Sequence, residues 1–141
     1  MRLLTGVRQM RNADDAATSA LVLLIGRNGY WWQRRAWDDD SHPGCLDFAA
    51  GGGIEPGETP LAAAERELAE ELGVSGLPLR AVGEMRLSGE RCALYQAPLP
   101  ESWRLGPEVA ELLPMPLQTL REQALHPQLA DWLGKADGLG A

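Results

Sequence analysis

The sequence predicts an α+β fold, and three kinds of segment lead to this prediction. Short apolar or alternating runs, typical of strands, occur both before and after a strongly marked helix at 60–72. Two pairs of these runs flank short turn-forming stretches, as in β-hairpins. Further helical segments follow near the C-terminus. With 141 residues, the chain is long enough for one domain with a real core.

The elements before the marked helix are expected to be strands. Residues 20–26 form a short apolar run that predicts a buried strand. Asn28-Gly29 is a strong hairpin turn signal, so 31–35 is expected to be the returning strand. After a polar loop at 38–41, a further strand at 46–50 is expected to lead into the glycines.

The helix at 60–72 has clear boundaries. Thr59 suits the N-cap, and Pro60 suits the first helical position, where its missing N–H costs nothing. Gly73 follows the last periodic residue and predicts the helix stop. One side of this helix is expected to face the core through Leu61, Ala64, Leu68 and Leu72.

The elements after this helix begin with a second hairpin around the turn at 87–90. A loop at 98–107 precedes an extended segment and two helices. The ranges expected for the strands and helices are 79–86, 91–97, 109–115, 117–124 and 127–133. The tail 134–141 is expected to fray. Residues 1–18 show no clear pattern and are compatible with a strand, an arm or disorder.

The acidic residues of the marked helix provide the first indication of function. Glu67, Glu70 and Glu71 have i, i+3, i+4 spacing and therefore share one face. Like charges at this spacing cost a helix a few tenths of a kcal/mol per pair. A divalent cation converts that repulsion into coordination, because Mg²⁺ prefers carboxylate oxygens, waters and substrate phosphates. The alternative is an ordinary Glu-rich surface helix.

The segment 52–74 resembles the Nudix box, G-x5-E-x7-R-E-U-x-E-E-x-G-U, in which U is aliphatic. Every defined position matches, and so many fixed positions make a chance match very improbable. The matching residues are Gly52, Glu58, Arg66-Glu67-Leu68, Glu70-Glu71 and Gly73-Val74. The resemblance implies a Nudix-type α/β/α sandwich, with a mixed β-sheet between helices.

The resemblance also implies a role for each matching polar residue. The metal ligands for Mg²⁺ or Mn²⁺ would be Glu67, Glu70, Glu71 and the carbonyl of Gly52. The catalytic residues would be Glu67, Arg66, Glu70 and Glu58. Arg66 would orient neighbouring acids, and Glu58 would brace the junction between loop and helix. The implied reaction is hydrolysis of a diphosphate linked to a group X, with Glu67 or an acid of a later loop as the base.

The stretch 30–37 supplies candidate substrate-binding residues. Alternation places Gln33 and Arg35 on one face and Trp32 and Arg34 on the other. Trp32 could stack on a planar group, and Arg34 or Arg35 could meet a phosphate; the alternative for each tryptophan is a place in the core. Glu111 and its neighbour Glu108 lie where Nudix proteins often place one further acid.

Two other functions are compatible with the resemblance. Gln33-Arg34-Arg35, His42-Pro43-Gly44 and Leu46-Asp47 resemble the subgroup related to isopentenyl diphosphate isomerase. The cysteine and metal-binding histidine of that isomerase are not found in 46–50, which favours hydrolysis. The second alternative is a non-catalytic Nudix-type nucleotide-binding or regulatory domain, which a broken acidic set would favour; here the set is intact.

Composition limits the partners. The net charge of −7, with no basic run, argues against extended nucleic-acid binding. Two widely spaced cysteines outside any metal or redox motif indicate reduced thiols and a cytoplasmic location. The N-terminus lacks a long apolar stretch, so neither a signal peptide nor a membrane partner is expected. The expected partner is a small diphosphate substrate such as a nucleotide, and Nudix proteins are often homodimers.

Overall fold

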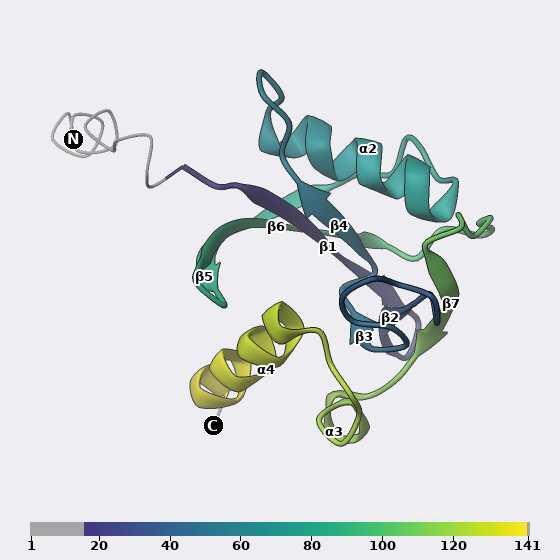
Figure 1. Cartoon of the computed structure of the whole chain (residues 1–141), viewed down its shortest axis with the longest axis vertical. Helices are drawn as coiled ribbons and strands as arrows, with labels where there is room; N and C mark the ends of the chain where they lie inside the picture. The colour runs from purple at the N-terminus through teal and green to yellow at the C-terminus, as the bar shows by residue number, and fades with distance from the viewer. Residues whose placement is uncertain (1–15, 141) are drawn as a thin grey trace, which may run out of the picture.

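A seven-stranded mixed sheet is the centre of the structure, a computed structural model that describes residues 16–140 (Figure 1). The strands are β1 (Ser19–Gly26), β2 (Gly29–Arg35), β3 (Leu46–Asp47), β4 (Ala50–Gly53), β5 (Arg80–Leu87), β6 (Glu90–Pro98) and β7 (Val109–Pro114). The helices are α2 (Pro60–Leu72), α3 (Leu117–Leu120) and α4 (Pro127–Gly140). The α+β class and the mixed sheet predicted from the sequence are therefore confirmed.

Strand β1 organises the sheet, because it changes partner along one of its edges. Its first half pairs with β4, ending at Val22 opposite Ala50. Its second half pairs with β2, beginning at Leu24 opposite Trp31. The other edge of β1 pairs with β6 in parallel, and β5 follows at the end of the sheet. The strands β2 and β4 therefore diverge from β1 at Leu23 and form a fork.

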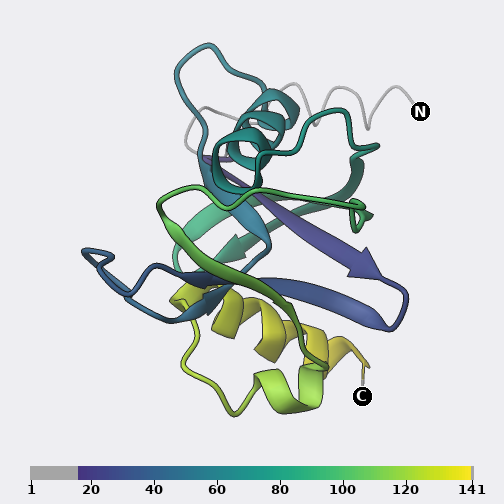
Figure 2. The ribbon, with the colours of Figure 1, turned by 90° about the vertical axis from the view of Figure 1, so that its right-hand side faces the viewer.

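Helices cover both faces of the sheet. Helix α2 packs against β4 and β1 on one face, and α4 packs against β3 and β5 on the other (Figures 1 and 2). Each face has its own apolar core. Leu24, Leu68 and Leu72 lie in the core under α2, whereas Trp32 and Leu129 lie in the core under α4. No helix in the described part of the chain has both the length and the apolar character needed to cross a membrane.

Helix α2 has the boundaries that the sequence predicts. Thr59 caps it, with its hydroxyl accepting a hydrogen bond from the Ala62 N–H, and Pro60 is the first helical residue. Gly73 ends the helix at a φ of 64°, a left-handed conformation that glycine adopts without penalty. The apolar stripe differs at one position, because Leu61 is 41% exposed and the buried side chain near the start is Ala63.

Three element boundaries differ from the predictions. The strand expected at 46–50 is split, since β3 pairs with β2 and β4 pairs with β1. Between them, the Ala49 carbonyl accepts from the Gln33 side chain. Helix α3 ends at Leu120, not at 124, whereas α4 continues past the predicted end at 133 to Gly140. Of the uncertain segment 1–18, residues 1–15 lie outside the described residues.

Candidate active site

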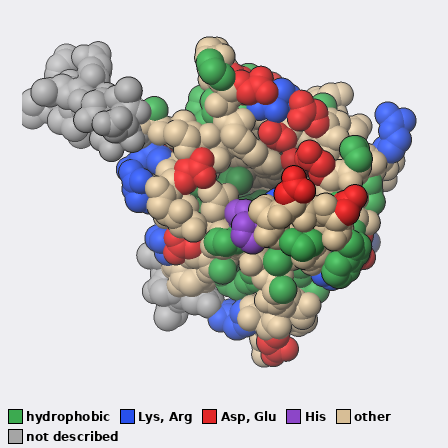
Figure 3. Space-filling model, in the orientation of Figure 1, with side chains coloured by type: hydrophobic (Ala, Val, Ile, Leu, Met, Phe, Trp, Pro, Cys, Tyr) green, Lys and Arg blue, Asp and Glu red, His purple; other side chains and the backbone are tan. Residues whose placement is uncertain are grey.

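A polar cavity of about 260 Å³ lies in the fork between β2 and β4. Both helical layers contribute to it: α2 supplies carboxylates from one side, and the start of α4 closes the other. In Figure 3 it is the hollow with acidic side chains along one side and the two histidines at its edge. The polar and aromatic side chains that line it are Gln33, Arg35, Asp39, Asp47, Phe48, Glu67, Glu71, Glu108, His126 and Gln128.

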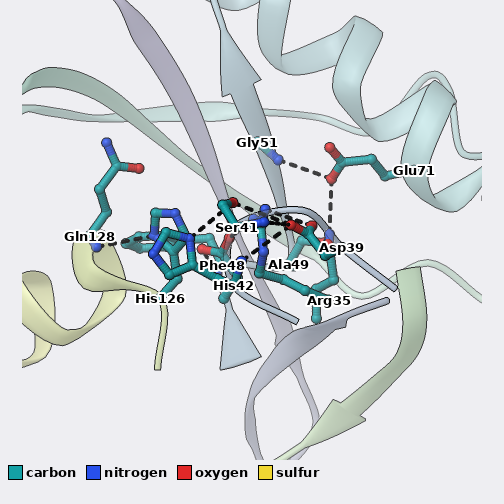
Figure 4. Close-up of polar contacts among 12 residues, drawn as sticks. Arg35, Asp39, Ser41, His42, Phe48, Ala49, Gly51, Glu71, His126 and Gln128 are labelled. Atoms are coloured by element: carbon teal, nitrogen blue, oxygen red, sulfur yellow. Dashed lines mark hydrogen bonds and ion pairs between the residues drawn. The ribbon is translucent and has the colours of Figure 1, made fainter. Parts of the chain in front are cut away.

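Two carboxylates from α2 point into this cavity from the buried side of the helix. Glu67 is 9% exposed and Glu71 is 8% exposed. One oxygen of Glu71, Oε1, accepts hydrogen bonds from the Gln33 Nε2 at 2.9 Å and from the Gly51 N–H at 3.2 Å (Figure 4). These bonds fix the direction of the Glu71 carboxyl group, because donors from both β2 and β4 hold the same oxygen.

The backbone of β4 comes unusually close to Glu67. A Cβ atom at Gly52 would overlap the Glu67 carboxylate, so this position has room only for a hydrogen. At the neighbouring Gly53, a Cβ would make only an ordinary van der Waals contact with the Thr18 carbonyl oxygen, at 3.9 Å. The close approach at Gly52 therefore lets the Glu67 carboxylate lie directly against the strand.

Arg66 ties the loop before α2 to the helix. Its guanidinium forms a two-point contact with Glu58, at 2.8 Å and 3.0 Å, and donates to the Gly53 carbonyl at 2.9 Å. The same group donates to Glu67 Oε2 at 3.0 Å. The hydrogen bonds from Arg66 lower the pKa of Glu58 to about 2, and those with Glu58 raise the pKa of Arg66. Arg66 is thus placed to orient Glu67.

Glu70 takes a different position from the one predicted for a metal ligand. Its side chain is 57% exposed and is turned to Arg66, at 3.4 Å. It does not line the cavity. Within residues 16–140, no group of three His, Cys, Asp or Glu side chains is arranged to hold a metal ion. Of the three predicted carboxylate ligands, the structure brings only Glu67 and Glu71 together.

The Glu67–Glu71 pair nevertheless fits a hard divalent cation. Burial, and then the neighbouring Glu67 carboxylate, raise the pKa of Glu71 to about 9. Two buried carboxyl groups in contact repel each other when both are ionised. A bound cation removes this repulsion, and Mg²⁺ and Mn²⁺ prefer oxygen ligands of this type.

The shifted Glu71 predicts how the stability of the metal-free protein depends on pH. The folded protein holds the Glu71 proton more tightly than the unfolded chain, whose reference pKa is 4.5. The free energy of unfolding should therefore fall as the pH rises from 4.5 towards 9. With a chelator present, Glu71→Gln should raise the melting temperature at pH 8 by at least about 3 °C. The melting temperature of this variant should also decrease less between about pH 5 and pH 8 than that of the wild type.

The matched control for this experiment is Glu122→Gln, which changes an exposed glutamate outside the cavity. This variant should keep the wild-type pH profile. Thermal unfolding of the three proteins in EDTA, at several pH values, makes the measurement. An unchanged profile for Glu71→Gln would contradict the raised pKa of Glu71.

A second polar group lines the far half of the cavity. Arg35 donates from Nη2 to Asp39, at 2.8 Å (Figure 4), and from Nη1 to Asp47, at 2.9 Å. Hydrogen bonds from the Ser41 N–H and its neighbours lower the pKa of Asp39 to about 2, whereas burial raises that of Asp47. Burial also lowers the pKa of His126.

Several residues that line the cavity were not among the site residues predicted from the sequence. Gln33, Asp47, His126 and Gln128 all line it. His126 directly precedes α4, and its Nδ1 accepts a hydrogen bond from the Gln128 N–H in the first turn of that helix. The alternation along 31–35 could have found Gln33, since Gln33 shares a strand face with Arg35.

The predicted substrate-binding residues separate into two groups. Arg35 lines the cavity, as does Glu108, the neighbour of the predicted Glu111. Trp32 is fully buried in the core under α4, where its indole N–H donates to the Met115 carbonyl. It therefore has no exposed face for a ligand. Arg34 and Glu111 pair with each other at 2.8 Å and do not line the cavity.

The chain matches one family model and is similar to several known proteins. Residues 15–133 match the family model described as the NUDIX domain. A Nudix hydrolase of Yersinia pestis is 43% identical over 92 residues, which are 64% of this chain and 50% of that protein. The Nudix hydrolase YfcD of Escherichia coli strain K12 is 38% identical over 77 residues, 55% of this chain and 43% of that protein.

The solved structures show the same fold. The structure of DR0079 from Deinococcus radiodurans superposes with a TM-score of 0.72 at 23% identity, covering 89% of each chain. The chain spans about half the length of the curated relatives it matches.

Proposed function

Since the chain belongs to the Nudix hydrolase family, we propose that it hydrolyses a diphosphate linkage in a small organic pyrophosphate. Such a substrate is a nucleoside diphosphate linked to a group X, or a related compound. The cofactor would be Mg²⁺ or Mn²⁺, and the catalytic residues would be Glu67, Arg66, Glu70 and Glu58. The reaction would take place in the cytoplasm, on a free small molecule.

The convergence of Glu67 and Glu71 in a polar cavity is the observation that supports this proposal most strongly. Both carboxyl groups are buried, and Oε1 of Glu71 is held by hydrogen bonds from Gln33 and Gly51. Glu67 and Glu71 would hold the cation, with Gly52 beside them. When bound, the cation would neutralise the diphosphate and acidify a water molecule.

The residues of the chain have separable tasks in this reaction. The oxygen of the attacking water bonds to one phosphorus, and the bridging P–O bond on that phosphorus breaks. One proton of the water passes to a carboxylate, for which Glu67 is the proposed base, and then to the departing oxygen. Arg66 holds the Glu67 carboxylate in place, and Gln33 does the same for Glu71.

A metal-dependent screen tests the proposal. The purified protein is incubated with a library of organic diphosphates in Mg²⁺, in Mn²⁺ or in EDTA, and released phosphate esters are separated and quantified. We expect at least one compound to be cleaved with metal, and cleavage to stop in EDTA. Cleavage of no compound, or equal cleavage in EDTA, would contradict the proposed reaction.

A further inference from the structure

The cavity extends beyond the proposed metal-binding carboxylates into a part that the proposed hydrolysis does not use. We call this part the polar half. It is lined by Arg35, Asp39, Asp47, Glu108, His126 and Gln128. These residues come from β2, from the loop that follows it, from β3, from the loop before β7 and from the start of α4. Because the polar half is continuous with the Glu67–Glu71 pair, a substrate held there would extend into it.

The charges of the polar half do not suit an additional phosphate. Arg35 is its only Lys or Arg side chain within residues 16–140, and its two terminal nitrogens are held by Asp39 and Asp47. Glu108 adds a third carboxylate. His126 adds no positive charge at neutral pH, because burial lowers its pKa and its Nδ1 accepts a hydrogen bond. A group carrying further negative charge would therefore be repelled here.

The described lining of the polar half contains no exposed Phe, Tyr or Trp ring on which a nucleobase could stack, and the His126 ring already contacts His42. Phe48 is the one Phe, Tyr or Trp among the described lining residues, and it is 1% exposed. Its ring packs edge-on against Trp132 in the core, at 5.9 Å between centroids. Trp31 and Trp103 pack against each other under α2. Base recognition by proteins commonly relies on such stacking.

The size of the cavity points to a small ligand group. Its volume of about 260 Å³ includes the region beside Glu67 and Glu71. Pockets for drug-sized ligands span roughly 300–1,000 Å³. The polar half therefore has room for one compact group and not for a second nucleoside.

Hydrogen-bonding groups of fixed direction remain available in the polar half. Gln128 donates from Nε2 to Glu90, at 2.7 Å, and this carboxylate is itself held by Thr18 and Ser19. The Oε1 atom of Gln128 receives no hydrogen bond from the described residues, so it can accept one from a ligand. The carboxylates are acceptors too. A hydroxyl group satisfies such acceptors by donating its proton, and it can also accept from an N–H donor.

We propose that the polar half binds the group X of the substrate, and that X is a small, uncharged group rich in hydroxyls, of the sugar or polyol class. This assignment rests on the proposed hydrolysis of a diphosphate linked to X. Gln128 would be a specificity-determining residue that contacts X and takes no part in bond cleavage.

A series of substrates that differ only in X tests the assignment. The substrates are uridine, cytidine, adenosine and guanosine diphosphates, each linked to one of four groups X: glucose, cyclohexyl, phosphate or methyl. For the nucleoside that is cleaved fastest, kcat/KM for the glucose compound should be at least about 10-fold higher than kcat/KM for the cyclohexyl and phosphate compounds. A factor of this size corresponds to one or two hydrogen bonds made to X. Preference for cyclohexyl or phosphate would overturn the assignment. Cleavage of no compound with any X would contradict the proposed hydrolysis, and this assignment with it.

The variant Gln128→Leu separates recognition of X from catalysis. It should lower kcat/KM for the glucose compound by about 5- to 10-fold and leave the methyl compound unchanged. Gln118→Leu, the same substitution at an exposed position of α3, is the control and should change neither. Equal losses on the glucose and methyl compounds would overturn the role of Gln128. If Gln128→Leu fails to fold, the substrate series on the wild-type protein decides the assignment.

Discussion

Replacing Glu67 by glutamine should lower kcat by at least about 100-fold while the protein stays folded. Glutamine keeps the shape of the side chain but removes the negative charge and the basicity. A general base contributes about 10²–10⁴-fold, and loss of a metal ligand adds to this. The melting temperature should be preserved or raised, because Glu67 lies beside the buried Glu71 carboxyl group. Steady-state kinetics in Mg²⁺ and thermal unfolding make the two measurements.

The control for this variant is Glu65→Gln, two residues earlier on the same helix. Glu65 is exposed and does not line the cavity. Its replacement should leave kcat within about 2-fold of the wild-type value, as expected for a surface change. Equal losses in the two variants would show that Glu67 has no special part in the reaction, even with the fold intact.

Replacing Gly52 by alanine should also lower kcat, by about 10²-fold, because the new methyl group would displace the Glu67 side chain of α2. The added methyl group would occupy the place of the Glu67 carboxylate. That carboxylate ends a flexible side chain and can move aside at little cost in stability. Misplacement of a reacting group by about 1 Å can cost 10²-fold in rate. We therefore expect a large loss of kcat with a melting temperature within about 3 °C of the wild type.

Gly53→Ala provides the matched control in the next position of β4. A Cβ atom at Gly53 would lie 3.9 Å from its nearest neighbour, the Thr18 carbonyl oxygen, and would displace nothing. This variant should keep nearly full activity. Comparable losses at the two glycines would indicate that β4 tolerates no side chain in general, and would remove the specific link between Gly52 and Glu67.

Local sequence patterns predicted α2 well, because its boundaries depend on nearby residues. Thr59 and Gly73 act within one turn of the helix ends. The inward direction of Glu67 and Glu71 also follows from helical spacing. The same spacing does not indicate that the Glu70 side chain is exposed and lies 3.4 Å from Arg66, four residues earlier on the helix.

Tertiary packing decided the features that the sequence left open. Alternation correctly placed Trp32 and Gln33 on opposite faces of the strand 31–35. It does not indicate which of the two faces lines the cavity. Asp47 and His126 meet there because β3 and the start of α4 pack together from distant parts of the chain. Such contacts leave no local pattern. The split of 46–50 was likewise missed, since it depends on strand partners.

The fork between β2 and β4 has a consequence for how this protein can diversify. Glu67, Gly52 and Arg66 belong to α2 and β4, which pack on the first half of β1. Asp47 and Gln128 belong to elements on the other branch. Mutations that reshape the core under α4 leave the core under α2 largely intact, because the two apolar cores lie on opposite faces of the sheet. Under the proposed function, selection can therefore change the residues proposed to bind X while the residues proposed for hydrolysis are inherited unchanged.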